Sequence, residues 1–366
     1  MKKVIQFIKK EIVLVIACIL ALVSSFIVPP DTGYIGYIDF RTLSILFCLM
    51  SVMAGFQKIG IFTFFAERLI TKVKGTRYLM FILVMLCFFF SMIITNDVAL
   101  ITFVPFTVTV LILIGKEKLT IPIVSLQTVA ANLGSMLTPI GNPQNLYLYG
   151  KSGMGLGEFI LLMLPYTIMS FVLLTVFIMF YKNDKGEVVL KSKTEIKKNK
   201  RIVIYPLLFI VSLMAVAKII DYKIAFIISV IVILIFDRLI FRYVDYSLLV
   251  TFAAFFIFIG NMGRIEVFKN MIENVIIGRE CITAVASSQI VSNVPAALLL
   301  SGFTDKTAEL IVGTNIGGLG TLIASMASLI SFKYVAAIEN KMKYILYFTA
   351  VNVIFLIVLL GMYFII

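Results

Sequence analysis

Residues 132–145 read NLGSMLTPIGNPQN, a segment rich in asparagine, glycine and proline inside an otherwise apolar stretch. Proline removes a backbone donor and clashes with the preceding helical turn, and glycine lowers helix propensity, so the segment predicts a broken helix. At membrane depth, broken backbone is tolerated only where protein buries it or where it lines a polar cavity. A related segment, NIGGLGTLIASMAS, follows at 315–328. We expect the two breaks to be halves of one binding site.

The composition is that of a membrane protein. Hydrophobic residues make up 61% of the sequence and charged residues only 14%, and the mean hydropathy is +1.09. Long apolar runs recur from end to end and predict an all-α polytopic protein surrounded by the lipid bilayer. The net charge of +13 could indicate nucleic acid binding. The Lys and Arg residues lie in short loops, however, where they orient the chain, so we expect no nucleic acid partner.

Cysteine and histidine usage argues against a metal site, a cofactor or an enzyme. The four cysteines show no CxxC spacing and are expected to be small core residues, and the sequence has no histidine. An intramembrane enzyme would need a nucleophile, a base or a metal within the membrane. We therefore expect a protein that is not an enzyme and that binds no cofactor beyond a coupling ion, Na⁺ or H⁺.

The first half, residues 1–181, is expected to form one structural repeat. Its basic start, MKKVIQFIKK, resembles a signal peptide, but we interpret it as the beginning of a retained first helix. The expected elements are spans at 12–28 and 42–56, an amphipathic segment at 58–75, an inward hairpin at 78–115, a broken span at 120–149 and a span at 159–181.

A basic segment, 182–201, is expected to be a cytoplasmic linker to the second repeat, 202–366. The expected elements of this repeat are an extra span at 202–220, spans at 224–241 and 247–261, an amphipathic segment at 264–277, an outward hairpin at 279–303, a broken span at 307–332 and a final span at 344–366. In total, the pattern predicts about nine full spans, two re-entrant hairpins and two broken helices.

Loop charge predicts the orientation in the membrane. Most Lys and Arg residues fall in the segments on the same side as the N-terminus, as the positive-inside rule requires of cytoplasmic loops. We therefore expect a multi-pass protein of the plasma (inner) membrane, with a cytoplasmic N-terminus and an external C-terminus.

The two halves resemble each other in residue type and order. Segment 132–140 aligns without gaps with 315–323 and keeps Asn, Gly, Thr and Ile at matching positions. Thr95-Asn96 aligns in the same way with Ser292-Asn293. The extra span at 202–220 inverts the second copy relative to the first. Inverted repeats with paired broken helices are typical of secondary transporters, whose site lies near the middle of the bilayer.

Over essentially its whole length the sequence resembles the ion transporter superfamily. This group includes divalent anion/sodium symporters, citrate permeases, arsenite/antimonite permeases, D-type sodium/proton antiporters and the melanosomal P protein. The most specific motifs are TPIGNPQN at 138–145, similar to the family's IGxPxN segment, and the hairpin tips Thr95-Asn96-Asp97 and Ser292-Asn293.

The resemblance implies a function for the hairpin tips. In the anion symporters both tips read Ser-Asn-Thr, and the tips and unwound loops hold sodium ions and substrate carboxylates. Here the tips read TND and SNV, so the third-position Thr is missing from both. The Asn96-Asp97 pair looks more like the arsenite permeases or the proton-coupled members. The resemblance also implies a homodimer, because members are often dimers.

The residue types at the tips and breaks suit ion and anion binding. The N-terminus of a half-helix offers unpaired N–H groups to an anion, and unwound carbonyls suit Na⁺. Glycine lets the backbone approach a ligand closely, although it could instead serve only tight helix packing. The expected substrate- and ion-binding residues are Thr95, Asn96, Asp97, Asn132, Gly134, Thr138, Gly141, Asn142, Asn145, Ser292, Asn293, Asn315, Gly317, Gly318, Thr321 and Ser325. Candidate Na⁺ ligands are Asn96, Asp97 and Gly141 in the first half and Asn293 and Gly317 in the second.

Asp97 is the only acidic residue placed deep within an apolar segment of the sequence. Burying an unpaired carboxylate costs about 2.5–3.5 kcal/mol or more on insertion scales, so Asp97 should be protonated, bound to an ion or facing water. Its counterpart, Val294, makes any coupling chemistry asymmetric. The alternative is that Asp97 caps the hairpin helix by accepting backbone N–H bonds, and the two roles are compatible.

Three transport functions agree with these features. The leading one is an ion-coupled secondary transporter of a small anion or oxyanion, such as a di- or tricarboxylate or arsenite, that works by alternating access. The first alternative is a sodium/proton antiporter in which Asp97 binds the exchanged cation. A channel is the third, because a polar cavity at the midplane does not by itself require alternating access. Saturable flux that exchanges with substrate on the far side would distinguish a carrier from a channel.

Overall fold

The computed structural model describes residues 11–70, 73, 75–184 and 201–366, and all regular structure within them is helical. The α-helices of the first half are α2 (Ile12–Ile27), α3 (Tyr34–Tyr37), α4 (Phe40–Ile59), α5 (Ile61–Ile70), α6 (Thr76–Phe90), α7 (Asn96–Leu113), α8 (Thr120–Gly134), α9 (Pro143–Ser152) and α10 (Leu156–Met179). Those of the second half are α11 (Arg201–Val216), α12 (Tyr222–Asp237), α13 (Tyr246–Gly263), α14 (Glu266–Ile276), α15 (Glu280–Val291), α16 (Asn293–Ser301), α17 (Thr307–Ile316), α18 (Met326–Val335) and α19 (Lys341–Tyr363). Three 3₁₀ turns complete the set: η1 (Glu117–Leu119), η2 (Ser135–Leu137) and η3 (Arg238–Tyr243).

Within the described residues, seven helical stretches are long and apolar enough to cross a membrane. Four further apolar helices, including α2 and α11, are shorter. Large apolar side chains also cover the outside of the molecule, as on α12, where Ile227, Ile231 and Ile235 are at least half exposed. In water such a surface would be unfavourable, whereas in lipid it is the expected one. The chain is therefore a polytopic helical membrane protein.

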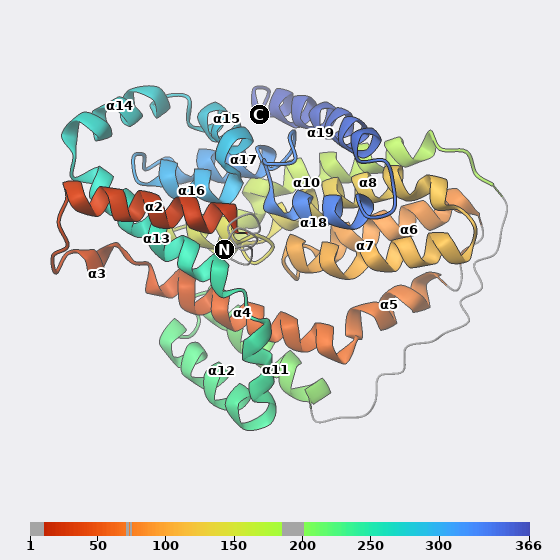
Figure 1. The fold of residues 1–366 in the computed structure, drawn as a ribbon, viewed down its shortest axis with the longest axis horizontal. Helices are drawn as coiled ribbons and strands as arrows, with labels where there is room; N and C mark the ends of the chain where they lie inside the picture. Colours follow the sequence, from red (N-terminus) through yellow and green to blue (C-terminus); the bar gives the residue numbers. More distant parts are fainter. Residues whose placement is uncertain (1–10, 71–72, 74, 185–200) are drawn as a thin grey trace, which may run out of the picture.

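The helices form two groups that lie side by side (Figure 1). In one group α2 packs on α13, and α4 packs on α11 and α12. The other group contains the two helical hairpins, α6–α7 and α15–α16, and the two broken helices, α8–α9 and α17–α18. In Figure 1 the α6–α7 hairpin occupies the right part of the molecule and the α15–α16 hairpin the left part. The short helices α5 and α14 lie at opposite ends.

The first broken helix leaves the α-helix where the sequence is rich in glycine and proline, and the second where it is rich in glycine. Helix α8 ends at Gly134, and α9 begins at Pro143, a residue that suits the first turn of a helix because it lacks an N–H group. Helix α17 ends at Ile316, and α18 begins at Met326. The hairpin turns differ in length. The first uses residues 91–95, whereas the second turns at Ser292 alone, which adopts a positive φ of 76°.

Some element boundaries differ from the sequence prediction. Lys58, predicted to begin an amphipathic segment, lies in the last turn of α4, because Gly60 ends that helix in the left-handed conformation with φ 77°. Arg201, predicted to end the linker, is the first residue of α11. Residues 185–200, the main part of the predicted linker, lie outside the described residues.

Arg201 and Lys58 meet at a buried aspartate at the end of α12. The Asp237 carboxylate lies 3.0 Å from Nζ of Lys58 and 3.1 Å from Nε of Arg201, and it accepts a 3.1 Å hydrogen bond from the Tyr205 hydroxyl. Asp237 is only 6% exposed, so its charge depends on these partners. This cluster joins the ends of α4, α11 and α12.

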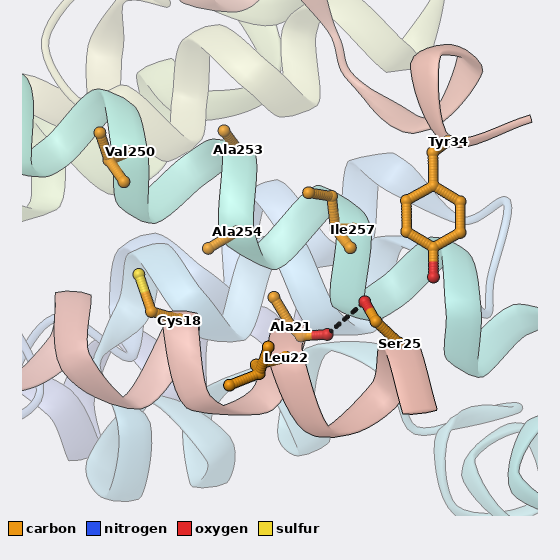
Figure 2. Close-up of a pocket in the computed structure, with 9 residues that line it drawn as sticks. All are labelled: Cys18, Ala21, Leu22, Ser25, Tyr34, Val250, Ala253, Ala254 and Ile257. Atoms are coloured by element: carbon orange, nitrogen blue, oxygen red, sulfur yellow. Dashed lines mark hydrogen bonds between the residues drawn. The ribbon is translucent and has the colours of Figure 1, made fainter. Parts of the chain in front are cut away.

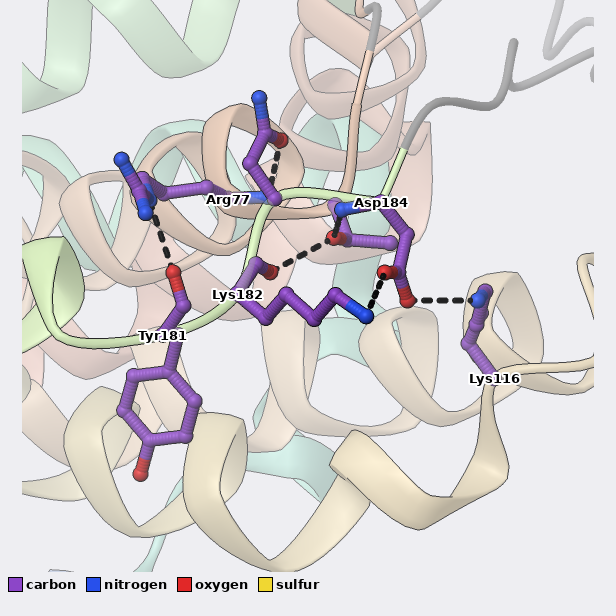
Figure 3. A network of polar contacts seen from close by, with 7 residues as sticks. Arg77, Lys116, Tyr181, Lys182 and Asp184 are labelled. Atoms are coloured by element: carbon purple, nitrogen blue, oxygen red, sulfur yellow. Dashed lines mark hydrogen bonds and ion pairs between the residues drawn. The ribbon is translucent and has the colours of Figure 1, made fainter.

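Residues 181–184, which follow α10, lie across the open end of the α6–α7 hairpin (Figure 3). The backbone N–H of Thr76 donates to the carbonyl of Asp184 at 3.0 Å, and the N–H of Asp184 donates to the Thr76 hydroxyl at 2.9 Å. Lys116, just beyond α7, contacts the Asp184 carboxylate at 3.0 Å. The hydrogen bond and charge of Lys116 hold the pKa of Asp184 below its ordinary value. Both arms of the hairpin are thus bound to the end of α10.

Candidate functional site

The tip of the first hairpin is bound to the first break. The backbone N–H of Asn96 donates to the carbonyl of Gly141 at 3.0 Å. The hydroxyl of Thr138 donates to the carbonyl of Met92 at 2.6 Å, at the end of the first arm. Within the break, the N–H of Gly141 donates to the carbonyl of Thr138 at 3.3 Å. We call this set of contacts the first crossing.

The second half repeats these contacts at the positions that the sequence alignment pairs. The N–H of Asn293 donates to the carbonyl of Ala324 at 2.9 Å, and the hydroxyl of Thr321 donates to the carbonyl of Gln289 at 3.4 Å. The N–H of Ala324 donates to the carbonyl of Thr321 at 3.2 Å. We call this set the second crossing. The backbone also agrees, because the residues that precede α9 and α18, Asn142 and Ser325, are both extended.

The glycines of the breaks allow the hairpins to approach closely. A Cβ atom on Gly134 would lie 2.0 Å from the carbonyl oxygen of Phe88, and one on Gly317 would lie 2.7 Å from the hydroxyl of Ser288. Protein atoms, rather than an open space, therefore face these glycines, which favours the packing interpretation. Gly141 and Gly318 are similarly confined, by Ser135 and by Asn293.

Asn132 joins the two crossings. Its side-chain carbonyl oxygen accepts from Nδ2 of Asn96 at 2.9 Å and from the hydroxyl of Ser325 at 3.0 Å. Its own Nδ2 group lies 3.4 Å from the carbonyl of Gly318. Asn132 is 3% exposed, so these are buried hydrogen bonds. One amide of the first half thus contacts the first hairpin tip and the second break together.

Asn315, the counterpart of Asn132, reaches in the opposite direction. Its Nδ2 group donates to the side-chain oxygen of Asn145 at 2.7 Å and to the carbonyl of Ile311 at 2.7 Å. Asn145 in turn donates to the carbonyls of Ser135 and Thr138, both at 3.3 Å. The second half therefore contacts the first break, as the first half contacts the second break.

Several polar atoms of this buried cluster have no hydrogen-bond partner among the described residues. They are the side-chain oxygens of Asn142 and Asn315 and both amide atoms of Gln144. Buried polar groups are nearly always paired in native proteins, so atoms of this kind are available to a ligand. The available groups are neutral amides, which can replace part of the hydration shell of an ion without adding a charge.

Four helices begin at the two crossings. Helix α7 starts at Asn96 and α9 at Pro143, on the first crossing, while α16 starts at Asn293 and α18 at Met326, on the second. The side chains that precede α9 and α18 form no capping hydrogen bond to the helix. The first N–H groups of these helices, and the positive ends of their dipoles, therefore face the polar cluster without a side-chain cap.

Asp97 lies in the first turn of α7 and is half-buried. The capping role belongs to Thr95, whose hydroxyl accepts from the N–H of Val98 at 3.4 Å, while the N–H of Asp97 donates to the side chain of Asn96 at 2.9 Å. Among the described residues the Asp97 carboxylate has no hydrogen bond or ion pair. Packing also buries two acids at helix ends, Asp237 and Glu280, more completely than Asp97.

Apart from Asp97, the predicted residues fall into two groups. Asn96, Asn132, Asn142, Asn145, Asn293, Asn315, Gly318 and Ser325 lie in the buried cluster. Thr95, Thr138, Gly134, Gly141, Ser292, Gly317 and Thr321 instead hold hairpin tips or breaks in place, and Thr321 is exposed. The carbonyl of Gly317 accepts from Gln289 at 2.9 Å.

Ser135 and Gln289 of the cluster are absent from the predicted binding residues, and the sequence leaves undecided whether Gln144 faces the pocket. Ser135 accepts from Asn142 at 2.6 Å, and Gln289 bonds to the second break. Gln144 has both amide atoms unpartnered. Their polar side chains in apolar segments are the only sequence signal, and that signal does not tell which way a side chain points.

Two hollows on the molecule have mainly apolar linings, and the second of them borders the first crossing at Thr138. One, of about 360 Å³, lies between α2 and α13 and is lined almost entirely by apolar side chains (Figure 2). Its polar residue Ser25 donates to the carbonyl of Ala21 at 2.8 Å within α2. The other, of about 290 Å³, lies between Pro139, α10 and α11. Their apolar linings suit lipid chains rather than an ion.

A helical chain with apolar outer faces and a buried polar cluster at two helix breaks defines a membrane transport protein. The family model described as citrate transporter (CitMHS) matches residues 4–310, and the chain belongs to this family. Relatives agree with this class. The chain is 34% identical over 323 residues to an uncharacterized transporter of Methanocaldococcus jannaschii, an alignment that covers 86% of each chain. The chain is accordingly a transporter and not an enzyme.

Two other relatives widen the range of similar proteins. The inner membrane protein YbiR of Escherichia coli is 31% identical over 323 residues, which cover 84% of each chain. A silicon efflux transporter of Oryza sativa subsp. japonica is 30% identical over 163 residues, or 44% of this chain and 33% of that one. Proteins similar to this chain thus include one described as a silicon efflux transporter.

Proposed function

We propose that this chain is an ion-coupled secondary transporter of a small anion or oxyanion, such as a di- or tricarboxylate or an arsenite-like species. The main support is that four helices begin at the two crossings, and the N-termini of α9 and α18 lack a side-chain cap. Helix N-termini favour anions, and here they meet neutral amides rather than fixed positive charges. Such a site binds an anion and also releases it readily, because no buried ion pair holds the anion in place.

The coupling ion is Na⁺ or H⁺. Carbonyl oxygens of the two crossings, such as those of Gly141 and Ala324, and the free side-chain oxygens of Asn142 and Asn315 are ligands of the type that Na⁺ prefers. A bound cation would also balance the charge of the anion in a medium of low dielectric constant. Binding of the two together therefore stabilises both.

We infer that the two halves are inverted repeats and that they produce alternating access. Packing between the halves supports this, since α9 contacts α16 and α17, while the corresponding α18 contacts α7 and α8. The hairpins and broken helices would move as a unit against the group formed by α2, α4, α11, α12 and α13. The proposal includes about nine full spans, re-entrant hairpins, a cytoplasmic N-terminus, an external C-terminus and a homodimer.

Ligand-dependent thermal stability tests the proposal. Purified protein is heated with citrate, succinate, sulfate, arsenite or silicate, each with and without Na⁺ and across pH. A bound ligand raises the unfolding temperature by mass action, so one anion should stabilise the protein more in the presence of the coupling ion. Asn96→Ala and Asn293→Ala should each abolish most of that shift. Unchanged shifts in both variants would remove the hairpin tips from the site.

Asp97 supports a second candidate function, sodium/proton antiport. Its carboxylate lies beside Asn96 at a crossing and has no partner among the described residues, so it could bind Na⁺ and H⁺ in turn. In reconstituted vesicles, Asp97→Asn should then abolish Na⁺-dependent proton movement. Full antiport in that variant would exclude the mechanism, whereas anion uptake without proton movement would favour the first function. Ohmic single-channel steps would indicate a channel instead of either.

A further inference from the structure

A cluster of charged residues lies at the open end of the second hairpin, away from the two crossings. Lys306, just before α17, places its Nζ 3.7 Å from Oε1 of Glu280 and 3.7 Å from Oε1 of Glu309. Glu280 and Glu309 are therefore close enough to interact electrostatically. Two carboxyl groups therefore share one ammonium group between the first turns of α15 and α17.

Burial makes this arrangement costly unless a further group balances it. Glu280 is 1% exposed, and its Oε2 atom has no hydrogen-bond partner among the described residues. Its Oε1 atom receives only a long, 3.5 Å hydrogen bond from the hydroxyl of Thr304. Lys306 is 55% exposed and Glu309 is 33% exposed, so water reaches the cluster from one side.

The charged residues Arg279 and Asp305 directly precede Glu280 and Lys306 in the chain, and three weak acids also lie around the cluster. Cys281 follows Glu280 on α15, Tyr166 comes from α10, and Tyr363 comes from α19. All three are neutral at physiological pH in their ordinary state. With both carboxylates ionised and Lys306 charged, the cluster has a net charge of minus one, and one added proton makes it neutral.

The first half shows that the architecture does not require these charges. At the positions that the two alignments pair with Glu280, Lys306 and Glu309, the first half has Leu83, Ile123 and Leu126. All three are 0% exposed and belong to the hydrophobic core. The charged set is therefore an addition to the second half at a place where apolar packing suffices.

We propose that Glu280 and Glu309 form a proton-binding carboxyl pair, balanced by Lys306, that holds the open end of the second hairpin against α17. Two ionised carboxylates repel each other, whereas one shared proton lets one carboxyl group donate to the other. With the proton, α15 and α17 are joined by a hydrogen bond. Without the proton, repulsion between the two carboxylates drives α15 and α17 apart. The site is distinct from the polar cluster at the crossings and binds H⁺ alone.

Infrared spectroscopy tests whether the proton is present. The C=O stretch of a protonated carboxyl group is separate from the bands of a carboxylate. The spectrum of the intact protein minus that of Glu309→Gln at neutral pH should show one protonated carboxyl group, which titrates away as the pH rises. The variant Asp97→Asn identifies any contribution of Asp97 to the spectrum. The control is Asp31→Asn, because Asp31 is an exposed carboxylate paired with Arg264 and its loss should leave the protonated carboxyl band unchanged. Identical spectra for the intact protein and Glu309→Gln would overturn the proposal.

Cys281 provides an independent measurement of the contact itself. Its thiol is 0% exposed and lies next to Glu280 in the chain. Because Cys18 is exposed, the experiment uses a Cys18→Ser background. Alkylation of Cys281 is followed by mass spectrometry across pH, against the same protein with Glu280→Gln and Glu309→Gln. The double variant shows the pH dependence of the thiol alone. The alkylation rate of the protein with both glutamates, divided by the rate of the double variant, should rise about tenfold as the shared proton is lost. This is the size expected for one charge-assisted hydrogen bond. A ratio independent of pH would overturn the proposal.

Discussion

The two hairpins make equivalent contacts at their tips and different contacts at their open ends. At the crossings, Asn96 and Asn293 donate to equivalent carbonyls with nearly equal distances, 3.0 and 2.9 Å. At the open ends, the first hairpin is bound by residues 181–184, whereas the second has the buried Glu280 as the first residue of α15. The inner contacts are therefore set by the shared architecture. The outer ends are where the two halves can be controlled separately.

The largest difference between the halves should come from the glycines beneath the hairpin tips. In Gly134→Ala the new Cβ would lie 2.0 Å from the backbone oxygen of Phe88, whereas in Gly317→Ala it would lie 2.7 Å from the Ser288 hydroxyl and 2.8 Å from the backbone oxygen of Gly313, a less severe overlap. We expect Gly134→Ala to lower the free energy of unfolding by about 3 kcal/mol and Gly317→Ala by about 1–2 kcal/mol. Thermal unfolding in detergent measures both.

Gly157→Ala is the matched control, because nothing lies within 4 Å of the added Cβ. Its unfolding temperature should be unchanged or slightly raised, since alanine favours a helix. Equal losses in Gly134→Ala and Gly317→Ala would mean that the two hairpins do not differ in how tightly they contact the breaks.

Asn132 and Asn315 provide an intermediate effect. Asn132→Ala leaves the buried donors of Asn96 and Ser325 without their acceptor, and each unpaired donor costs about 1–3 kcal/mol of free energy. Asn315→Ala leaves only acceptors without a donor. Asn132→Ala should therefore reduce the initial transport rate more than Asn315→Ala, by about tenfold or more. Thr109→Ala, which loses only a hydrogen bond within its own helix, is the control. A larger loss in Asn315→Ala would reverse this ranking.

The smallest effect should come from Asp184, at the open end of the first hairpin. Because Lys116 lowers the pKa of Asp184, the pair stabilises the folded protein at neutral pH and is lost as the pH falls through that lowered pKa. Asp184→Asn should slightly lower the unfolding temperature at neutral pH and match the intact protein in acid. Lys182→Gln, whose Nζ lies 4.0 Å away and is largely exposed, should change less. A difference that persists in acid would contradict the assignment to this pair.

The sequence predicts the parts of the fold that local chemistry controls. Pro143 and the glycines near it exclude a continuous helix, and α8 and α9 are separated there. The motif that contains Asn132 recurs around Asn315, so the cluster residues could be found from their repetition. Long apolar runs similarly indicate where most helices lie, to within a few residues at their ends.

Contacts between the halves could not be predicted in the same way. Nothing local in the sequence shows that Asn132 bonds to Ser325 or that Asn315 bonds to Asn145, because these pairs depend on how two distant breaks pack. Glu280 was overlooked for a related reason. It stands at the end of an apolar run, where a charge is normally solvated, and only the packing of α17 against α15 buries it.

The bonds of Asn132 also bear on how the protein is made. Its partner Ser325 lies 193 residues further along the chain, and Thr128 on the same helix bonds to Ser331, 203 residues away. When the first half leaves the ribosome, these polar groups have only their partners within that half, Asn96 for Asn132 and the Val124 carbonyl for Thr128. The early half therefore lacks these bonds until the last helices are synthesised, and those helices complete the polar cluster at the crossings.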